Sequence, residues 1–140
     1  MQYKTEYRVM ELPDGYNNYL NTPGNVIDFL KDRFTPVREE MHLICLNIKN
    51  RVIEHHVIAI GGYNTLMCTP RDIFTPVLQA NCNSFILAHN HPSDDCTPSE
   101  EDIIFTKKIE KAAGIMGMTF TDHIIFGSDD TYSFRKNGHL

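Results

Sequence analysis

Two histidines and one carboxylate lie close together along this chain, in a spacing that one metal ion could use. His89 and His91 are two residues apart, so their imidazoles leave an extended segment on the same side. Asp102 follows a turn-rich loop, at the expected first turn of a helix that Ser99 opens. Two imidazoles and a carboxylate, with a fourth position left for water, are typical of a catalytic rather than a structural zinc site. The pattern predicts a hydrolase with one Zn²⁺ per chain.

The segments around these residues favour a single site. The histidines end the apolar run 84–88, which is typical of a buried strand. Ser99 and Asp102 precede the apolar residues 103–105, and this spacing also fits an ordinary capping box. Each piece alone has a purely structural explanation. Together they favour a site, because sites in α/β folds collect at the C-termini of strands and the N-termini of helices.

Three helices are expected elsewhere in the pattern. Thr22-Pro23 and Thr69-Pro70 each combine an N-cap with proline at the first helical position. The third helix is expected from Glu100 to Ala113, ended by Gly114. In the helix after Thr69, three apolar side chains are expected to point inward: Ile73, Val77 and Leu78.

Strands are expected between these helices. The β-rich runs 41–48 and 52–60 flank Lys49-Asn50-Arg51 and predict a hairpin. Further strands are expected over 5–12, 84–88 and 118–126, and a short one follows the turn 127–130. This order predicts an α/β fold, with a mixed sheet covered by helices on both sides.

Composition predicts one cytoplasmic domain over residues 1–140. The chain has 140 residues, of which 41% are hydrophobic, enough to bury a core. It has no apolar run near eighteen residues and no signal-peptide pattern, so no membrane association is expected. The four cysteines never approach a C-x-x-C spacing, which favours free thiols. A net charge of −5 argues against broad binding to nucleic acid.

The combined motif resembles the JAMM (MPN+) metallohydrolase signature, and its details are similar to the RadC-like branch, long labelled as DNA repair proteins. The similarity covers roughly residues 24–140 and leaves residues 1–20 as a less certain N-terminal extension. It implies a three-layer α/β/α fold of the cytidine deaminase-like, JAB/MPN type. The segments that carry it are His89 to Ser93, Pro98 to Asp102, Asp122-His123-Ile124, Lys49 to Ile53, Pro70 to Ile73 and Tyr132-Ser133-Phe134.

The resemblance also implies a mechanism, the hydrolysis of a peptide or isopeptide bond by a metal-activated water. A glutamate before an early strand accepts the proton of the water in such enzymes. Glu39 and Glu40 are both candidates, and registering residues 43–47 against the family's strand favours Glu39. Ser99 would hydrogen-bond the oxyanion. The identity of the substrate, which would be a protein or peptide, stays open.

Several residues keep more than one interpretation. Asp94 stands where the family usually has glycine, and the nearby Cys96 thiol is more often inert than a further metal ligand. His123 is interpreted as a structural histidine ahead of a site residue. Arg71 at a helix start indicates either a salt bridge or a substrate contact. The remaining histidines named here, His55, His56 and His139, are expected to be exposed.

Two other functions compete with hydrolysis. A DNA repair or recombination module is disfavoured, because no helix-hairpin-helix segment fits before the motif and the charge is acidic, so DNA binding is expected to be weak or absent. The second competing function is that of a scaffold, which binds a metal and a protein partner without catalysis. It would have no need of a glutamate near the metal. The oligomeric state and the metal loaded in the cell stay open.

Overall fold

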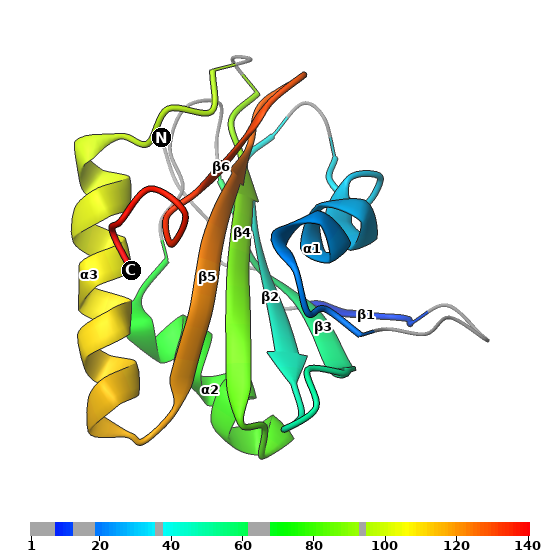
Figure 1. The fold of residues 1–140 in the computed structure, drawn as a ribbon, viewed down its shortest axis with the longest axis vertical. Coiled ribbons are helices and arrows are strands. Elements are labelled where there is room, and N and C mark those ends of the chain that lie inside the picture. The colour runs from blue at the N-terminus through cyan, green and yellow to red at the C-terminus, as the bar shows by residue number, and fades with distance from the viewer. Residues whose placement is uncertain (1–7, 13–18, 36–37, 62–67, 93–94) are drawn as a thin grey trace.

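The structure is a computed structural model that describes residues 8–12, 19–35, 38–61, 68–92 and 95–140 (Figure 1). Six strands and three helices occur in these ranges. In chain order they are β1 (Arg8–Met10), α1 (Pro23–Leu30), β2 (Glu40–Leu46), β3 (Val52–Ile60), α2 (Pro70–Ala80), β4 (Ser84–Asn90), α3 (Glu100–Ile115), β5 (Thr119–Phe126) and β6 (Thr131–Ser133).

The strands form one mixed sheet in the order β1-β3-β2-β4-β5-β6. Strands β4 and β5 are parallel and joined through α3, whereas every other neighbouring pair is antiparallel. The expected hairpin is β2 and β3, connected by a turn in which Asn50 adopts a φ of 63°. The sheet confirms the predicted α/β class with mixed strand directions.

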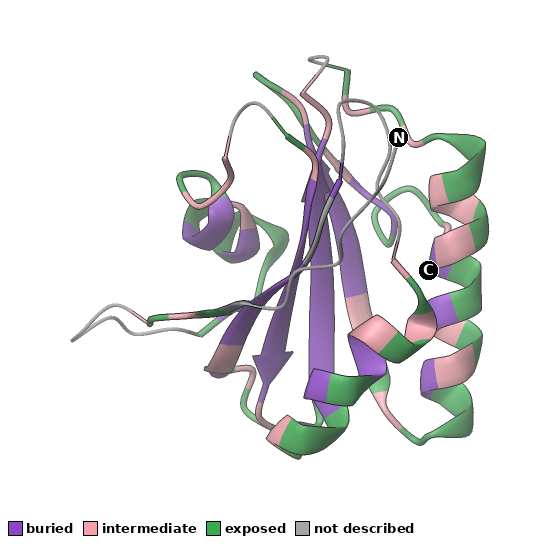
Figure 2. Cartoon of the chain, turned by 180° about the vertical axis from the view of Figure 1, so that it is seen from behind, coloured by how far each residue is buried: buried purple, intermediate pink, exposed green. Residues whose placement is uncertain are grey.

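Helices cover both faces of the sheet (Figure 1). Helices α2 and α3 pack on one face, where Ile73, Val77 and Ile109 contact Leu43 and Leu87 within one buried cluster. Helix α1 packs on the opposite face through a second cluster. Figure 2 shows the strands between these layers as almost continuously buried. Successive side chains of a strand point to opposite faces of the sheet. Each side chain on β2 or β4 therefore lies either on the face covered by α2 and α3 or on the face covered by α1.

The three predicted N-caps are confirmed, because Thr22, Thr69 and Ser99 each accept a backbone N–H bond at a helix start. The expected end of α3 at Gly114 was wrong. The helix continues to Ile115, and it is Gly117 that takes the left-handed conformation (φ 71°) that glycine favours after a helix.

Three smaller expectations need correction. Leu78 was expected to point inward but is 57% exposed, whereas Ile73 and Val77 are buried as expected. Strand β2 occupies 40–46 rather than 41–48, because Asn47 leaves the ladder to begin the turn. Of the expected strand 5–12, β1 covers Arg8–Met10, and residues 5–7 lie outside the described part of the chain.

All four cysteines are free thiols, as the sequence predicted. Within the described ranges, the helices are all too short or too polar to span a membrane.

Candidate metal centre

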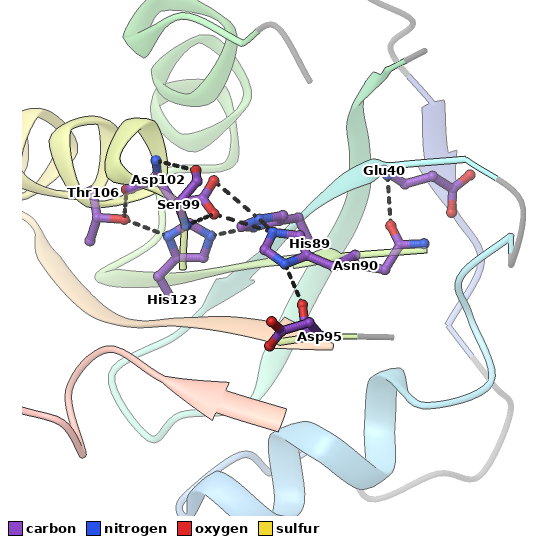
Figure 3. A network of polar contacts seen from close by, with 9 residues as sticks. Glu40, His89, Asn90, Asp95, Ser99, Asp102, Thr106 and His123 are labelled. Atoms are coloured by element: carbon purple, nitrogen blue, oxygen red, sulfur yellow. Dashed lines mark hydrogen bonds and ion pairs between the residues drawn. The ribbon is translucent and has the colours of Figure 1, made fainter. Parts of the chain in front are cut away.

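The structure brings His89, His91 and Asp102 together where β4 ends and α3 begins. Figure 3 shows His89 and Asp102 directed toward each other from these two elements. One ligand atom from each residue lies within 4.8 Å of the others. The Nε2 atoms of the two histidines are 3.1 Å apart. The Asp102 carboxylate approaches His89 Nε2 at 3.3 Å and His91 Nε2 at 3.2 Å. Three donors thus converge on one point from two elements.

The other ring nitrogen of each histidine is already hydrogen-bonded. His91 Nδ1 lies 2.8 Å from the Asp95 carbonyl oxygen, which can only accept, so Nδ1 carries the proton. His89 Nδ1 lies 2.7 Å from His123 Nε2. Both side chains therefore direct Nε2, the nitrogen used by the triad, toward Asp102. Such outer partners are what orient metal-binding histidines in proteins.

The carboxylate has the protonation state that a ligand needs. Burial would raise the pKa of Asp102, but the hydrogen bonds from His89 and His91 outweigh it and hold that pKa far below its usual value. Burial would lower the pKa of His91, whereas its bonds to Asp102 and the Asp95 carbonyl raise it above the usual value. In the absence of a cation, Asp102 thus favours the protonated form of His91.

Glu39 lies on the metal side of the sheet. Met41 pairs with His89, and extending this register by two residues places Glu39 opposite His91. Burial raises the pKa of the half-buried Glu39 carboxyl, and the charges of His89 and His91 act on it to lower that pKa. The register and these electrostatic effects agree in placing Glu39 on the side of the sheet that holds the triad.

Glu40 belongs to the opposite, α1 face and is completely buried. Its Oε1 lies 3.2 Å from His42 Nε2 and accepts the Thr35 N–H bond at 2.9 Å. Burial alone would raise the pKa of Glu40. The hydrogen bonds outweigh burial and hold this pKa below its usual value, so the carboxylate stays ionised. Figure 3 shows the Glu40 side chain directed away from His89 and Asp102. The two adjacent glutamates therefore occupy different environments.

Asn90 fixes the segment that carries Glu39. Its Oδ1 accepts the Glu40 N–H bond at 2.8 Å, and its Nδ2 donates to the Arg38 carbonyl at 2.8 Å and the Thr35 carbonyl at 3.4 Å. Asn90 itself is 7% exposed. The residue between the two histidines thus ties the chain before β2 to the end of β4. Sequence reasoning missed this role, although the position inside His89-Asn90-His91 was a signal.

Ser99 occupies the N-cap of α3, where its Oγ accepts the Asp102 N–H bond at 3.0 Å. The Ser99 N–H in turn donates to Asp102 Oδ2 at 2.9 Å, which completes the capping box and orients the carboxylate. The hydroxyl hydrogen takes no part in these two bonds. The residue thus has both the ordinary structural role and an exposed O–H beside the triad.

Four other residues had more than one interpretation from the sequence, and the structure describes three of them. His123 is completely buried and bonds His89 directly. Cys96 is half-buried and does not belong to the group of converging ligand atoms. Arg71 is exposed on the first turn of α2. Asp94 lies outside the described residues.

The expected exposure of His55 and His56 was wrong, because both are at most 1% exposed. Strand β3 lies between β1 and β2 rather than at an edge, so its polar side chains point into covered faces. His55 bonds His42 at 2.8 Å, and His56 bonds Glu54 at 2.6 Å. His139 is half-buried beside Phe134.

A cavity of about 290 Å³ opens on the α1 side of the sheet, between the end of α1 and the ends of β4 and β5, and His91 is the triad residue that lines it. His91 and Pro92 form one side, and Phe34 and Phe126, whose ring centroids are 5.0 Å apart, form an aromatic wall. This volume is just below the range of small-molecule sites, roughly 300–1,000 Å³.

A mixed sheet between helices, with two histidines and an aspartate converging at a strand end and a helix start, defines an α/β domain with a candidate metal centre. Residues 20–139 match the RadC-like JAB domain, and the chain belongs to this family.

Bacterial relatives agree with this assignment. The chain is 36% identical to the UPF0758 protein of Aquifex aeolicus over 121 residues, which are 86% of this chain and 52% of the relative. It is 35% identical to one from Caldanaerobacter subterraneus over 133 residues, covering 94% and 57%. One from Listeria monocytogenes is 40% identical over 103 residues, covering 74% and 46%. The chain thus spans about half the length of these relatives.

Proposed function

We propose that this domain is a metal-dependent hydrolase of amide bonds, acting on a peptide or isopeptide substrate. The observation that carries the proposal is the place of Glu39, which directly precedes β2 on the side of the sheet that holds His89, His91 and Asp102, close enough for the charges of the two histidines to lower its pKa. A purely structural metal site has no use for a nearby carboxylate that is not a ligand.

The three donors fit a divalent cation. Two imidazole nitrogens and one ionised carboxylate oxygen suit zinc best and leave a position open for catalysis. The bonds at His91 Nδ1 and His89 Nδ1 leave both Nε2 atoms facing this position. A divalent ion held there would act as a Lewis acid that makes water more acidic and polarises a carbonyl group.

The protein residues then have separate tasks. Glu39 accepts the proton of the attacking water and returns it to the leaving nitrogen, a task favoured by a carboxyl pKa above the usual value. The Ser99 hydroxyl, whose oxygen is held by the Asp102 N–H bond, donates its hydrogen to the carbonyl oxygen as negative charge develops there. Asn90 keeps the Glu39 segment in place.

The first test is the metal content of purified protein. We expect about one divalent ion per chain in the wild type and a severe loss in His91→Ala and Asp102→Ala, because each variant removes one of three donors. Elemental analysis after dialysis measures this directly. Equal metal content in all three proteins would exclude the site.

The second test compares the adjacent glutamates. Glu39→Gln keeps the size of the side chain but cannot accept a proton, so we expect metal content to persist and the rate of amide hydrolysis to fall by about 10² to 10⁴. Glu40→Gln perturbs the α1 face, and we expect it to lower stability with a far smaller effect on the rate per folded molecule. An active Glu39→Gln enzyme would exclude Glu39 as the base. A metal-loaded wild type without hydrolytic activity on a broad peptide set would favour the scaffold function instead.

A further inference from the structure

His123 is a completely buried histidine that is not needed as a ligand, yet it contacts one. We propose that Thr106 and His123 are positioning residues that hold the His89 imidazole in the tautomer whose Nε2 lone pair faces the metal position. This inference rests on the proposed metal-dependent function. It assigns a task to the Asp122-His123-Ile124 and Tyr132-Ser133-Phe134 segments, which the hydrolytic mechanism does not use.

The direction of each hydrogen bond follows from the one before it. The Asp102 backbone carbonyl can only accept, so the Thr106 hydroxyl donates to it at 2.7 Å. The same hydroxyl oxygen lies 2.7 Å from His123 Nδ1, and since its hydrogen is already used, Nδ1 must be the donor. A neutral His123, the form that complete burial favours, then has a lone pair on Nε2.

The last bond of the series sets the tautomer of His89. His123 Nε2 accepts from His89 Nδ1 at 2.7 Å, so the lone pair that a bound cation would use is on His89 Nε2, the nitrogen directed at Asp102. With the opposite direction, His89 would carry its proton on Nε2, where the proton would compete with a cation. The bonds begin at the backbone of Asp102 and end at His89, so one ligand helps to orient another.

The His123 ring has little freedom to turn. Phe134 stacks on it with the ring centroids 4.7 Å apart and an interplanar angle of 11°, and the Phe134 N–H donates to the His123 carbonyl at 3.0 Å. Asp122 accepts bonds from the Ser133 hydroxyl at 2.5 Å and from the Arg135 N–H at 3.0 Å, which holds the Phe134 segment beside β5. The two motif segments together form a support for one imidazole.

The test removes only the hydroxyl that fixes the direction of the series. Thr106→Val keeps the shape of the side chain, and the matched control is Thr75→Val. The Thr75 hydroxyl makes the same helical bond, to the Arg71 carbonyl at 2.8 Å, without a histidine partner. With zinc and a competing chelator, we expect Thr106→Val to bind the ion about 10- to 100-fold more weakly, as for other losses of outer partners. Thr75→Val should bind like the wild type, and Thr106→Ser should restore most of the affinity.

A spectroscopic measurement separates positioning from general destabilisation. Long-range ¹H–¹⁵N correlation of the imidazoles shows which nitrogen carries the proton, and we expect His123 to be the Nδ1–H tautomer in wild-type protein, with and without zinc. In Thr106→Val this preference should be lost, and Thr106→Ser should retain it. Wild-type His123 protonated at Nε2, or at both nitrogens, would overturn the inference even if Thr106→Val fails to fold. So would equal zinc affinity in folded Thr106→Val and Thr75→Val. A wild type without zinc affinity would instead remove the proposed function, with the tautomer result still deciding the hydrogen-bond directions.

Discussion

Replacing Asn90 by alanine should remove the hydrogen bonds that hold the segment carrying Glu39, without removing a metal ligand. The Glu40 N–H is buried and has the Asn90 amide oxygen as its acceptor at 2.8 Å. The Arg38 carbonyl loses a partly buried bond of the same length. The bond to the Thr35 carbonyl is long, at 3.4 Å, and contributes little.

The expected cost follows from these two bonds. A buried donor left without an acceptor costs about 1–3 kcal/mol, and a partly buried hydrogen bond contributes about 0.5–1.5 kcal/mol. We therefore expect Asn90→Ala to lower the free energy of unfolding by about 1.5–4.5 kcal/mol. The control is Asn137→Ala, which removes a single amide bond, to the Ser133 carbonyl at 2.8 Å, from an exposed residue and should cost less than about 1 kcal/mol.

Urea unfolding followed by circular dichroism measures both variants, and metal analysis accompanies it. We expect Asn90→Ala to keep its metal, because its side chain is not a donor, and to lose hydrolytic activity under conditions where it is fully folded, since Glu39 is no longer held. A loss of stability equal to that of Asn137→Ala would refute the reasoning. Full activity in the folded variant would show that Asn90 does not position the glutamate.

Three further predictions concern pH, DNA and substrate preference. In metal-free protein, Asp102 has a lowered pKa and so stabilises the fold above its ordinary value of 3.8, whereas His91 has a raised pKa and stabilises it fully below 6.5. Melting temperatures in chelator should therefore decline as the pH falls below about 3.8 or rises above about 6.5, and Asp102→Asn should flatten the upper decline. An unchanged slope in that variant would contradict the assignment. Duplex DNA should bind no more tightly than about 10⁻⁴ to 10⁻⁶ M at physiological salt, measured by fluorescence anisotropy, and nanomolar affinity would favour a DNA-associated function instead. Amides with leucine or phenylalanine beside the scissile bond should be cleaved faster than those with aspartate, because Phe34 and Phe126 line the cavity next to His91. Ser128→Leu should reduce this preference at the cavity edge, whereas Thr131→Leu, exposed at the start of β6, should not; equal rates for all amides would show that the cavity is not used.

The sequence was sufficient for the helix starts and for the grouping of the triad, because both depend on local chemistry. Thr69-Pro70 and Ser99-x-x-Asp102 specify their caps within one turn of chain. The separation of Glu39 from Glu40 also follows from strand alternation, once the register of β2 against β4 is known.

What the sequence could not provide depends on long-range pairing. Glu54, His55 and His56 are consecutive polar residues, a pattern that favours an exposed hairpin, and only the place of β3 between two other strands buries both histidines. Thr106 is an unremarkable threonine in a helix until β5 brings His123 beside it. Tertiary contacts of this kind leave no periodic signal.

The alternation of faces along β2 and β4 also limits which changes in chain length the domain tolerates. Glu39 and His89 lie on the side of the sheet that holds the triad, while their neighbours Glu40 and Asn90 lie on the opposite side. Deleting or inserting one residue within β2 would exchange the two glutamates, sending the wrong carboxylate to each side. Insertions and deletions in variants that keep the site should therefore occur in the connections between strands. The lengths of β2 and β4 are constrained by the site as well as by the fold.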